Sequence, residues 1–215
     1  MEVFINGIGL ISPKPTFEGT GYSLSSIQVD APDRLRCIEP DYKNYINPSL
    51  LRRMSRMIKM GITAAKICLA NAGVEKPGAI ITGTGLGCIE DTEKFIHSII
   101  ENNEELLTPT PFIQSTHNTV GGQIALLLNC HEYNFTYVHR GISFESALSD
   151  ASMLLQENSA DTVLVGGIDE LTDNSFKLLK QLGIYNQRTV GGEGAAFFLV
   201  SGKKNRKFCC QNFCS

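Results

Sequence analysis

The sequence contains no tryptophan, no long apolar run and no marked excess of one charge. None of its stretches approaches the ~20 uninterrupted apolar residues that a membrane-spanning helix requires, and its start, Met1-Glu2-Val3-Phe4, lacks the basic residues of a secretory signal. The 19 Lys and Arg against 22 Asp and Glu give a net charge of −3, which excludes a basic nucleic-acid footprint. We therefore expect no membrane span, no nucleic-acid partner and a cytoplasmic location.

The cysteines do not indicate a disulfide-bonded fold. There are 7, an odd number at irregular spacing, which argues against disulfide bonds. Three of them crowd the end of the chain beside the basic run 203–207: Cys209, Cys210 and Cys214. Three soft ligands without a nearby histidine favour a loose, oxidisable tail over the alternative of a metal site, so we expect no metal and no cofactor.

What the sequence does contain is an alternation of strand and helix patterns. At 215 residues, 42% hydrophobic and 19% charged, the chain is long enough for one domain with a core. Short β-branched or apolar runs predict strands at 3–11, 79–82, 133–139, 162–167 and 194–200. Periodic segments predict helices at 50–72, 91–102, 120–128 and 143–157, with a turn at 109–112. This order is typical of an α/β layered domain.

Two local features of these elements invite interpretation. Arg52, Arg53, Arg56 and Lys59 crowd the start of the long helix and oppose its dipole, so they are expected to meet acidic groups elsewhere or on a partner, or to form a solvated face. The glycine turn at 83–87, between a strand and a helix, suggests a nucleotide site. Its third glycine is one residue early for the dinucleotide fingerprint, so we interpret it as a tight turn.

Six segments in one order resemble the N-terminal half of the β-ketoacyl synthases, the condensing enzymes of the thiolase fold. They are the strand and turn 6–13, the helix from Arg52 to Gly73, the glycine turn 83–87, the segment 118–124, the strand and double glycine 160–170, and the Gly-Glu-Gly-Ala motif at 192–196. The sequence particularly resembles the abbreviated ketoacyl-synthase-like proteins of fatty-acid, polyketide and aryl-polyene pathways.

This resemblance implies a fold. We expect one thiolase-like half, an α/β protein with αβα layers, a mostly parallel sheet and helices on both faces. Residues 1–202 would form this ketoacyl-synthase-like N-terminal domain, and 203–215 a basic, Cys-rich tail. In the family, the strand before the nucleophile pairs with its equivalent in a second subunit. Residues Phe135 to Val138 would be that strand here, so we expect a dimer.

The resemblance also locates the nucleophile position. In the family it is a cysteine at the start of a buried helix, where the helix dipole and backbone N–H groups favour thiolate and oxyanion. Counting back from Gly166-Gly167 without a gap places Gly141 there. Glycine has no nucleophilic atom, and a one-residue slip finds no cysteine, because none lies between Cys130 and Cys209.

The family's other catalytic groups are two histidines and a lysine in a second half that follows the Gly-Glu-Gly-Ala strand. The chain ends soon after that strand, and its histidines do not match their motifs: His97, His117, His131 and His139. We therefore expect no orthodox catalytic residue in this chain. We expect His117 to satisfy backbone groups in a loop, and Glu193 to cap a turn.

Around Gly141, two interpretations remain open. Ser143 could attack an acyl group with His139 as its base, although a serine at a helix start is ordinarily a cap. Alternatively, His139 and Arg140 plug the former acyl tunnel, and the stretch that includes Ser143 and Phe144 contacts an acyl chain or a partner.

The sequence thus supports two hypotheses. The first is a non-catalytic, chain-length-factor-like pseudoenzyme that binds a full-length ketoacyl synthase, an acyl carrier protein or a carrier-bound acyl chain. The second is a carrier-protein-dependent acyltransferase or condensing enzyme that uses Ser143 or a site completed by another chain. A truncated gene product is a third possibility.

Overall fold

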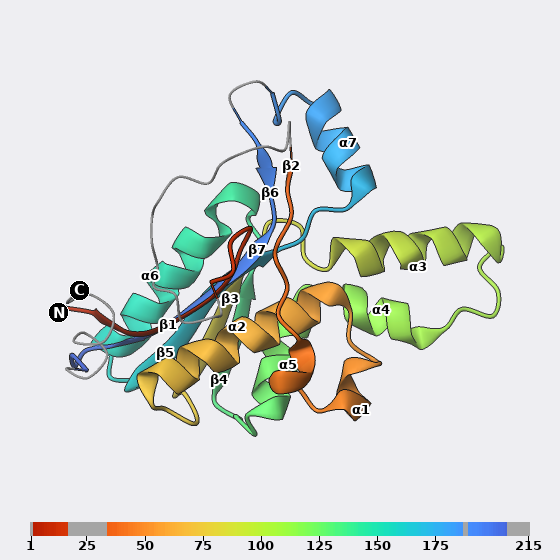
Figure 1. The fold of residues 1–215 in the computed structure, drawn as a ribbon. Coiled ribbons are helices and arrows are strands. Elements are labelled where there is room, and N and C mark those ends of the chain that lie inside the picture. Colours follow the sequence, from red (N-terminus) through yellow and green to blue (C-terminus); the bar gives the residue numbers. More distant parts are fainter. Residues whose placement is uncertain (1, 17–33, 187–188, 206–215) are drawn as a thin grey trace.

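A five-stranded sheet forms the centre of the molecule (Figure 1). The structure, a computed structural model, describes residues 2–16, 34–186 and 189–205. The order of the strands across the sheet is β1 (Phe4–Ile11), β7 (Gly194–Ser201), β5 (Thr162–Asp169), β3 (Ala79–Gly83) and β4 (Tyr133–Tyr137).

The sheet is mostly parallel, as predicted. Strand β3 runs parallel to both β5 and β4, whereas β7 runs antiparallel to both β1 and β5. Four of the five strands therefore share one direction, and β7 alone opposes them. Gly83 at the end of β3 is in register with Tyr137 on one side and Gly167 on the other, so the carboxyl ends of the three parallel strands lie level.

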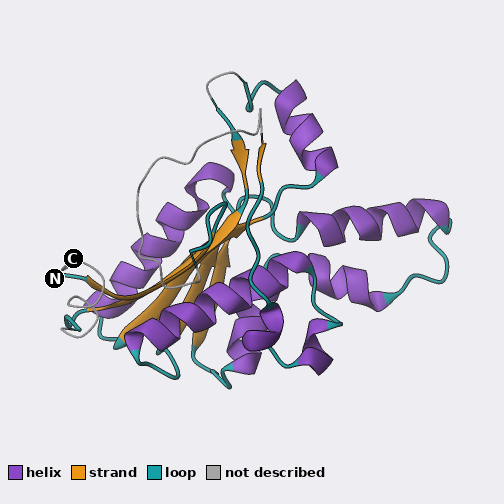
Figure 2. Ribbon diagram, in the orientation of Figure 1, coloured by secondary structure: helices purple, strands orange, loops and turns teal. Residues whose placement is uncertain are grey.

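Helices cover both faces of this sheet, which confirms the layered α/β fold (Figure 2). Helices α2 (Arg56–Ala72) and α5 (Thr119–Leu127) pack on one face, and α6 (Ser143–Gln156) packs on the other. Alternate residues of each strand enter the two cores: Ile80 of β3 lies in the core under α2, and its neighbour Ile81 lies in the core under α6.

The predicted helix over 50–72 is interrupted. Helix α1 spans Pro48–Leu51 and is capped by Asn47, whose side chain accepts a hydrogen bond from the Ser49 N–H. Ser55 then takes extended backbone angles, with φ −68° and ψ 168°, and α2 begins after it. Ser55 thus occupies the N-cap position of α2, although its side chain makes no cap hydrogen bond. The predicted end is confirmed, because Gly73 adopts the left-handed conformation at φ 68°.

Close contact between β1 and α2 depends on a glycine. A Cβ atom at Gly9 would lie 2.0 Å from the Ala64 carbonyl oxygen and 2.6 Å from the Cys68 nitrogen of α2. No side chain fits in that space, so Gly9 lets the helix lie directly on the strand. The glycines of the opening strand therefore determine how closely the α2 layer packs.

Several smaller elements surround the sheet. Helix α3 (Ile89–Glu101) packs beside α4 (Pro109–Ser115), and the pair extends away from the sheet (Figure 1). A turn was predicted at the start of α4, but Pro109 occupies its first helical turn, where a fixed φ suits a helix. The remaining elements are η1 (Tyr42–Asn44), η2 (Arg140–Ile142), α7 (Asp173–Gln181), and the parallel pair β2 (Arg34–Leu35) and β6 (Gly191–Gly192). Within the described ranges, no helix is both long enough and apolar enough to cross a bilayer.

Candidate functional site

The predicted site residues gather at the carboxyl edge of the sheet. Strands β3, β4 and β5 all end there. The glycine turn 83–87 follows β3, the turn 139–142 follows β4, and Asp169 is the last residue of β5. Ligand sites of parallel α/β sheets usually lie outside the carboxyl ends of the strands, so the topology itself marks this edge as the place to examine.

Asp169 holds the glycine turn. Its Oδ1 accepts hydrogen bonds from the Gly85 N–H at 2.8 Å and the Thr84 hydroxyl at 2.9 Å, and a longer one from the Leu86 N–H at 3.4 Å. Burial raises the pKa of Asp169, and these three hydrogen bonds act in the opposite direction. In a nucleotide site the backbone N–H groups of the glycine turn would donate to a phosphate. Here the N–H groups of Gly85 and Leu86 donate to Asp169, which supports the interpretation as a tight turn.

His117 packs against the far end of the same turn. A Cβ atom at Gly87 would lie 2.7 Å from Cδ2 of the imidazole ring. Gly87 also has a φ of +70°, which side chains rarely adopt, so two independent reasons require glycine there. The His117 ring therefore helps to cover the turn.

Ser143 ties the two turns together. It is the first residue of α6 and it is buried. Its hydroxyl oxygen accepts a hydrogen bond from the His139 N–H at 2.8 Å and lies 2.8 Å from the carbonyl oxygens of both Thr84 and Arg140. The single hydroxyl proton is therefore held by backbone carbonyl groups. Ser143 is thus not the predicted cap, because the N-cap of α6 is Ile142 and no side chain caps that helix end; its hydroxyl instead fastens the turn 139–142 to the glycine turn.

Gly141 lies in the 3-10 turn before α6 and is exposed. A Cβ atom built on it would meet nothing within 4 Å. A cysteine side chain would therefore fit, and the lack of a nucleophile here does not come from a lack of space. The preceding Arg140 is also exposed and has a φ of 53°, a left-handed conformation that is uncommon for residues with a side chain.

The His139 ring is not placed as a base for Ser143. It is the backbone N–H of His139 that contacts the Ser143 hydroxyl. The ring itself lies 3.4 Å from the Ser146 hydroxyl and 6.0 Å, between centroids, from the ring of Tyr137. Phe144 points into the core under α6, where its ring centroid is 6.0 Å from that of Phe198.

The thiols of the described residues lie on the other side of the sheet. Cys68, Cys88 and Cys130 belong to the core under α2, and Cys37 packs against it. Burial raises the pKa of Cys88, the residue before α3, to about 12. A buried thiol with a raised pKa is a poor nucleophile. The tail cysteines predicted at the chain end fall outside the described residues, and the described part contains no cluster of three or more His, Cys, Asp or Glu suited to a metal.

Glu193 was expected to cap a turn, but its buried carboxylate forms an ion pair with the partly buried Arg56. Its carboxylate accepts two hydrogen bonds from Arg56, at 2.6 and 2.8 Å, and one from each of the backbone N–H groups of Cys37 and Leu171. Burial would raise the pKa of Glu193, but the hydrogen bonds from Arg56 and the two N–H groups lower it overall. Arg56 also pairs with Glu39, so this member of the basic helix start does meet acidic groups, as expected.

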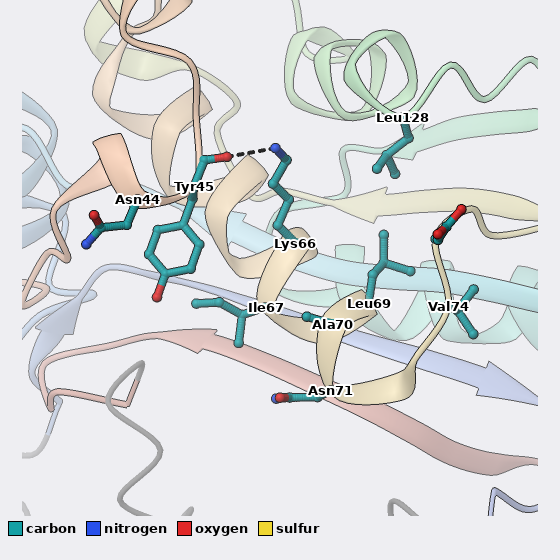
Figure 3. A pocket seen from close by; sticks show the side chains of 10 residues that line it. Asn44, Tyr45, Lys66, Ile67, Leu69, Ala70, Asn71, Val74 and Leu128 are labelled. Atoms are coloured by element: carbon teal, nitrogen blue, oxygen red, sulfur yellow. Dashed lines mark hydrogen bonds between the residues drawn. The ribbon is translucent and has the colours of Figure 1, made fainter.

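Two hollows lie near these elements. The larger, about 560 Å³, is lined by the last turns of α2, where Lys66 Nζ donates a hydrogen bond to the Tyr45 carbonyl at 2.7 Å (Figure 3). Since α2 ends just before β3 begins, this hollow lies away from the carboxyl edge, and none of the predicted site residues lines it. The smaller, about 450 Å³, is at the carboxyl edge and includes Asp169 and Glu193.

A family profile described as β-ketoacyl synthase, N-terminal domain, matches residues 35–205. No curated protein matches the sequence. Among solved structures, the chain is similar to the ishigamide ketosynthase/chain length factor, with a TM-score of 0.73 and 18% identity over 94% of this chain and 62% of that one.

Two further structures are similar. One is a ketosynthase in complex with its chain length factor from Xenorhabdus doucetiae, with a TM-score of 0.69 and 15% identity over 95% of this chain and 81% of that one. The other is a type II polyketide synthase acyl carrier protein in complex with its ketosynthase bound to the hexaketide, with a TM-score of 0.72 and 17% identity over 97% and 64%. At these identities the likeness establishes the fold. The chain spans less than two thirds of the length of the first and third of these proteins.

Proposed function

The chain belongs to the β-ketoacyl synthase family, whose N-terminal domain it contains, and on that premise we propose that it is a non-catalytic partner of an active synthase in fatty-acid, polyketide or aryl-polyene biosynthesis. The observation that carries this proposal is the residue at the nucleophile position. Gly141 lies in the turn that starts α6, at the position that the count from Gly166-Gly167 assigns to the family's cysteine, and it offers no atom to form an acyl thioester.

The surroundings of Gly141 support the same conclusion. The hydroxyl of Ser143 is committed to backbone groups, and the His139 ring forms no hydrogen bond with it. The cysteines of the described segments lie in or against the core on the opposite face of the sheet. We therefore propose that the alternative, a Ser143-dependent acyltransferase, is the weaker of the two hypotheses.

The proposed partner surface is the outer edge of β4. This strand is at the end of the sheet and pairs only with β3 among the described strands. The rings of Tyr133, Phe135 and Tyr137 form a row along it, with centroids 6.2 and 5.0 Å apart, and Phe135 is 46% exposed. An unpaired strand edge beside exposed aromatic rings is suited to pairing with a second chain. Phe135, from the predicted pairing segment, is the centre of this row.

The partners we propose follow those of the similar structures. One of these is a ketosynthase with its chain length factor, and another contains an acyl carrier protein. For this chain we propose a cysteine-bearing ketoacyl synthase at the β4 edge, with a second copy of this chain as the alternative occupant. The stretch around His139 and Arg140 would then face the carrier-bound acyl chain.

Co-purification tests the partner surface. The chain is co-expressed with a cysteine-bearing synthase from its own genome, and the complex is measured by light scattering after size exclusion. Phe135→Asp should abolish the complex, because it places a charge in the middle of the pairing edge. The control Leu182→Asp changes another exposed apolar residue, after α7, and should leave the complex intact. A wild-type chain that stays monomeric with every synthase tested contradicts the proposal.

Mass spectrometry tests the lack of catalysis. The wild-type chain, incubated with acyl carrier protein loaded with acyl chains, should gain no acyl mass. Gly141→Cys should become a target for iodoacetamide at residue 141, because the position is exposed and open. An acyl adduct on Ser143 of the wild-type chain would replace the partner hypothesis with the acyltransferase hypothesis.

A further inference from the structure

The smaller hollow has a lining of unusual chemistry. It has a volume of about 450 Å³ and lies where β1 and β5 end and β7 begins. Most of its lining is aliphatic or glycine: Leu10, Ile11, Pro13, Leu35, Gly167, Ile168, Gly192, Gly194, Ala195 and Ala196. Small ligands usually bind in hollows of this kind, with an apolar lining and a few polar groups that fix their orientation.

Three residues with polar side chains line it, and two of them are already satisfied. The Ser12 hydroxyl donates to the Lys14 carbonyl and accepts from the Lys14 N–H. Both carboxylate oxygens of Glu193 accept two hydrogen bonds each, from Arg56 and from backbone N–H groups. Neither side chain has strong hydrogen-bonding capacity left for a ligand.

Asp169, the third, is satisfied on one oxygen only. Its Oδ1 takes all three hydrogen bonds from the glycine turn, and no described residue donates to Oδ2. Three donors on one oxygen favour the ionised carboxylate, although burial opposes it. Asp169 thus lines the apolar hollow and carries one carboxylate oxygen, Oδ2, that receives no hydrogen bond from the described residues.

From this asymmetry we propose that the hollow binds a primary amine carried on an apolar chain, with the ammonium group on Asp169 Oδ2. An ammonium donor gives the strongest available match, because hydrogen bonds between two charged groups are shorter and about twice as strong as neutral ones. The apolar chain would lie against Leu10, Leu35 and Ala196. A ligand with a carboxylate head is disfavoured, since it would meet like charge. This site is independent of the partner function proposed above.

An NMR titration of the full chain tests the proposal. The amide groups of Gly85 and Leu86 donate to Asp169, so their chemical shifts report directly on its carboxylate. The probes are n-hexylamine, 1-hexanol and hexanoate, which share one apolar chain and differ in the head group. We expect n-hexylamine to shift both amides, because only its ammonium group can form a charge-assisted hydrogen bond with the carboxylate. It should bind at least about tenfold more tightly than the other two probes, a difference of about 1.4 kcal/mol.

The substitution Asp169→Asn replaces the acceptor oxygen of the proposed site by a hydrogen-bond donor. Asp169→Asn keeps an oxygen for the glycine turn and presents an NH2 donor in place of Oδ2. It should lose at least about tenfold in n-hexylamine affinity and gain affinity for hexanoate. The control Asp150→Asn removes a carboxylate on α6, which accepts from the Tyr133 hydroxyl, and should leave binding unchanged.

Ala196→Leu provides a second variant that leaves the carboxylate in place. It fills part of the hollow and should weaken n-hexylamine binding while the circular dichroism spectrum stays that of the wild type. The proposal is overturned if n-hexylamine shifts neither amide, if it binds no more tightly than 1-hexanol, or if a folded Asp169→Asn binds it as the wild type does.

Discussion

The two faces of the sheet differ in how they are covered. The face under α2 and α5 has the larger core, which includes the three buried cysteines, and the Glu193–Arg56 ion pair lies beside it. Among the described helices, α6 alone covers the other face, and the aromatic row of β4 lies along the edge of that face. The turn that contains Gly141 leads into α6. The larger core therefore lies on the α2 face, whereas the proposed partner edge and the predicted nucleophile position lie on the α6 side.

The turn before α6 shows the same contrast on a smaller scale. At Gly83, a Cβ atom would lie 2.8 Å from the backbone of Ser143, whereas at Gly141 it would meet nothing within 4 Å. There is therefore no room for a side chain at Gly83, which packs against the start of α6, whereas there is room for one at Gly141 inside the turn. A side chain added at Gly141 should therefore leave the fold unaffected.

The largest effect is expected from breaking the ion pair of the α2 face. Glu193→Ala leaves Arg56 without its buried partner and leaves the N–H groups of Cys37 and Leu171 without an acceptor. The free energy of unfolding should fall by about 3–5 kcal/mol in urea titrations. Asp173→Ala, which breaks the exposed pairs with Arg34 and Arg36, should cost far less. Equal losses for the two variants would contradict the contrast between buried and exposed pairs.

A second test uses pH on the other buried glutamate of this region. Glu170 accepts one hydrogen bond from the Glu90 N–H, and burial raises its pKa from 4.5 to about 7. Because the folded-state pKa is raised, the wild type is stabilised below about pH 4.5 and loses that stability as pH rises to about 7. Glu170→Gln does not titrate, so its advantage over the wild type should grow over this range, by up to about 3 kcal/mol.

The measurement is urea unfolding of both proteins at several pH values between 4 and 8. Glu193 should behave in the opposite way, because its lowered pKa contributes stability above the ordinary glutamate range and loses it as pH falls through the folded-state pKa. A pH-independent difference between Glu170→Gln and the wild type would show that Glu170 does not titrate in this range.

The third test addresses the α6 side. Ser143→Ala removes the acceptor of the His139 N–H and the donor to the Thr84 and Arg140 carbonyl groups. The loss should be about 1–3 kcal/mol, the cost of leaving buried polar groups without partners. Ser146→Ala, one turn further along α6, loses two exposed contacts, to the Ile142 carbonyl and to the His139 ring, and should change the melting temperature less. Unchanged stability of Ser143→Ala would mean that its hydroxyl does not hold the turn.

The smallest effect is expected at Gly141. Gly141→Ala should be neutral or stabilise the fold by about 0.5 kcal/mol, because the site is open and alanine restricts the unfolded chain. Gly83→Ala, its matched control, should destabilise the fold measurably, because backbone atoms block the added methyl group. A destabilising Gly141→Ala would show that this position serves the fold after all.

Much of the fold could be predicted because its signals are local. The apolar strand 162–167 and the Gly73 helix end were both expected, and both are confirmed in β5 and α2. Helix α4 and the break before Ser55 were missed, since turn and helix signals compete there and only the surrounding packing decides. The reversed direction of β7 was not predicted either, because pairing with β1 and β5 joins residues far apart in the sequence.

The candidate site could be predicted in part. The gapless count selected Gly141, which lies in the turn before α6, and its assignment to the nucleophile position stays a prediction. The role of Asp169 was missed, although an acidic residue at the end of a buried strand beside a glycine turn is a signal of such a contact. The same is true of Glu193, whose position between glycines suggested only a turn.

By itself the sequence determined the family resemblance and the type of fold, because residue identity and hydrophobic periodicity are properties of neighbouring residues. Only the tertiary structure decided which groups are satisfied. Ser143 and Glu193 have their polar atoms bound by segments from other parts of the chain, whereas no described residue donates to the second oxygen of Asp169. A hydrogen bond requires two atoms within about 3 Å of each other, and that proximity arises only when distant segments pack together.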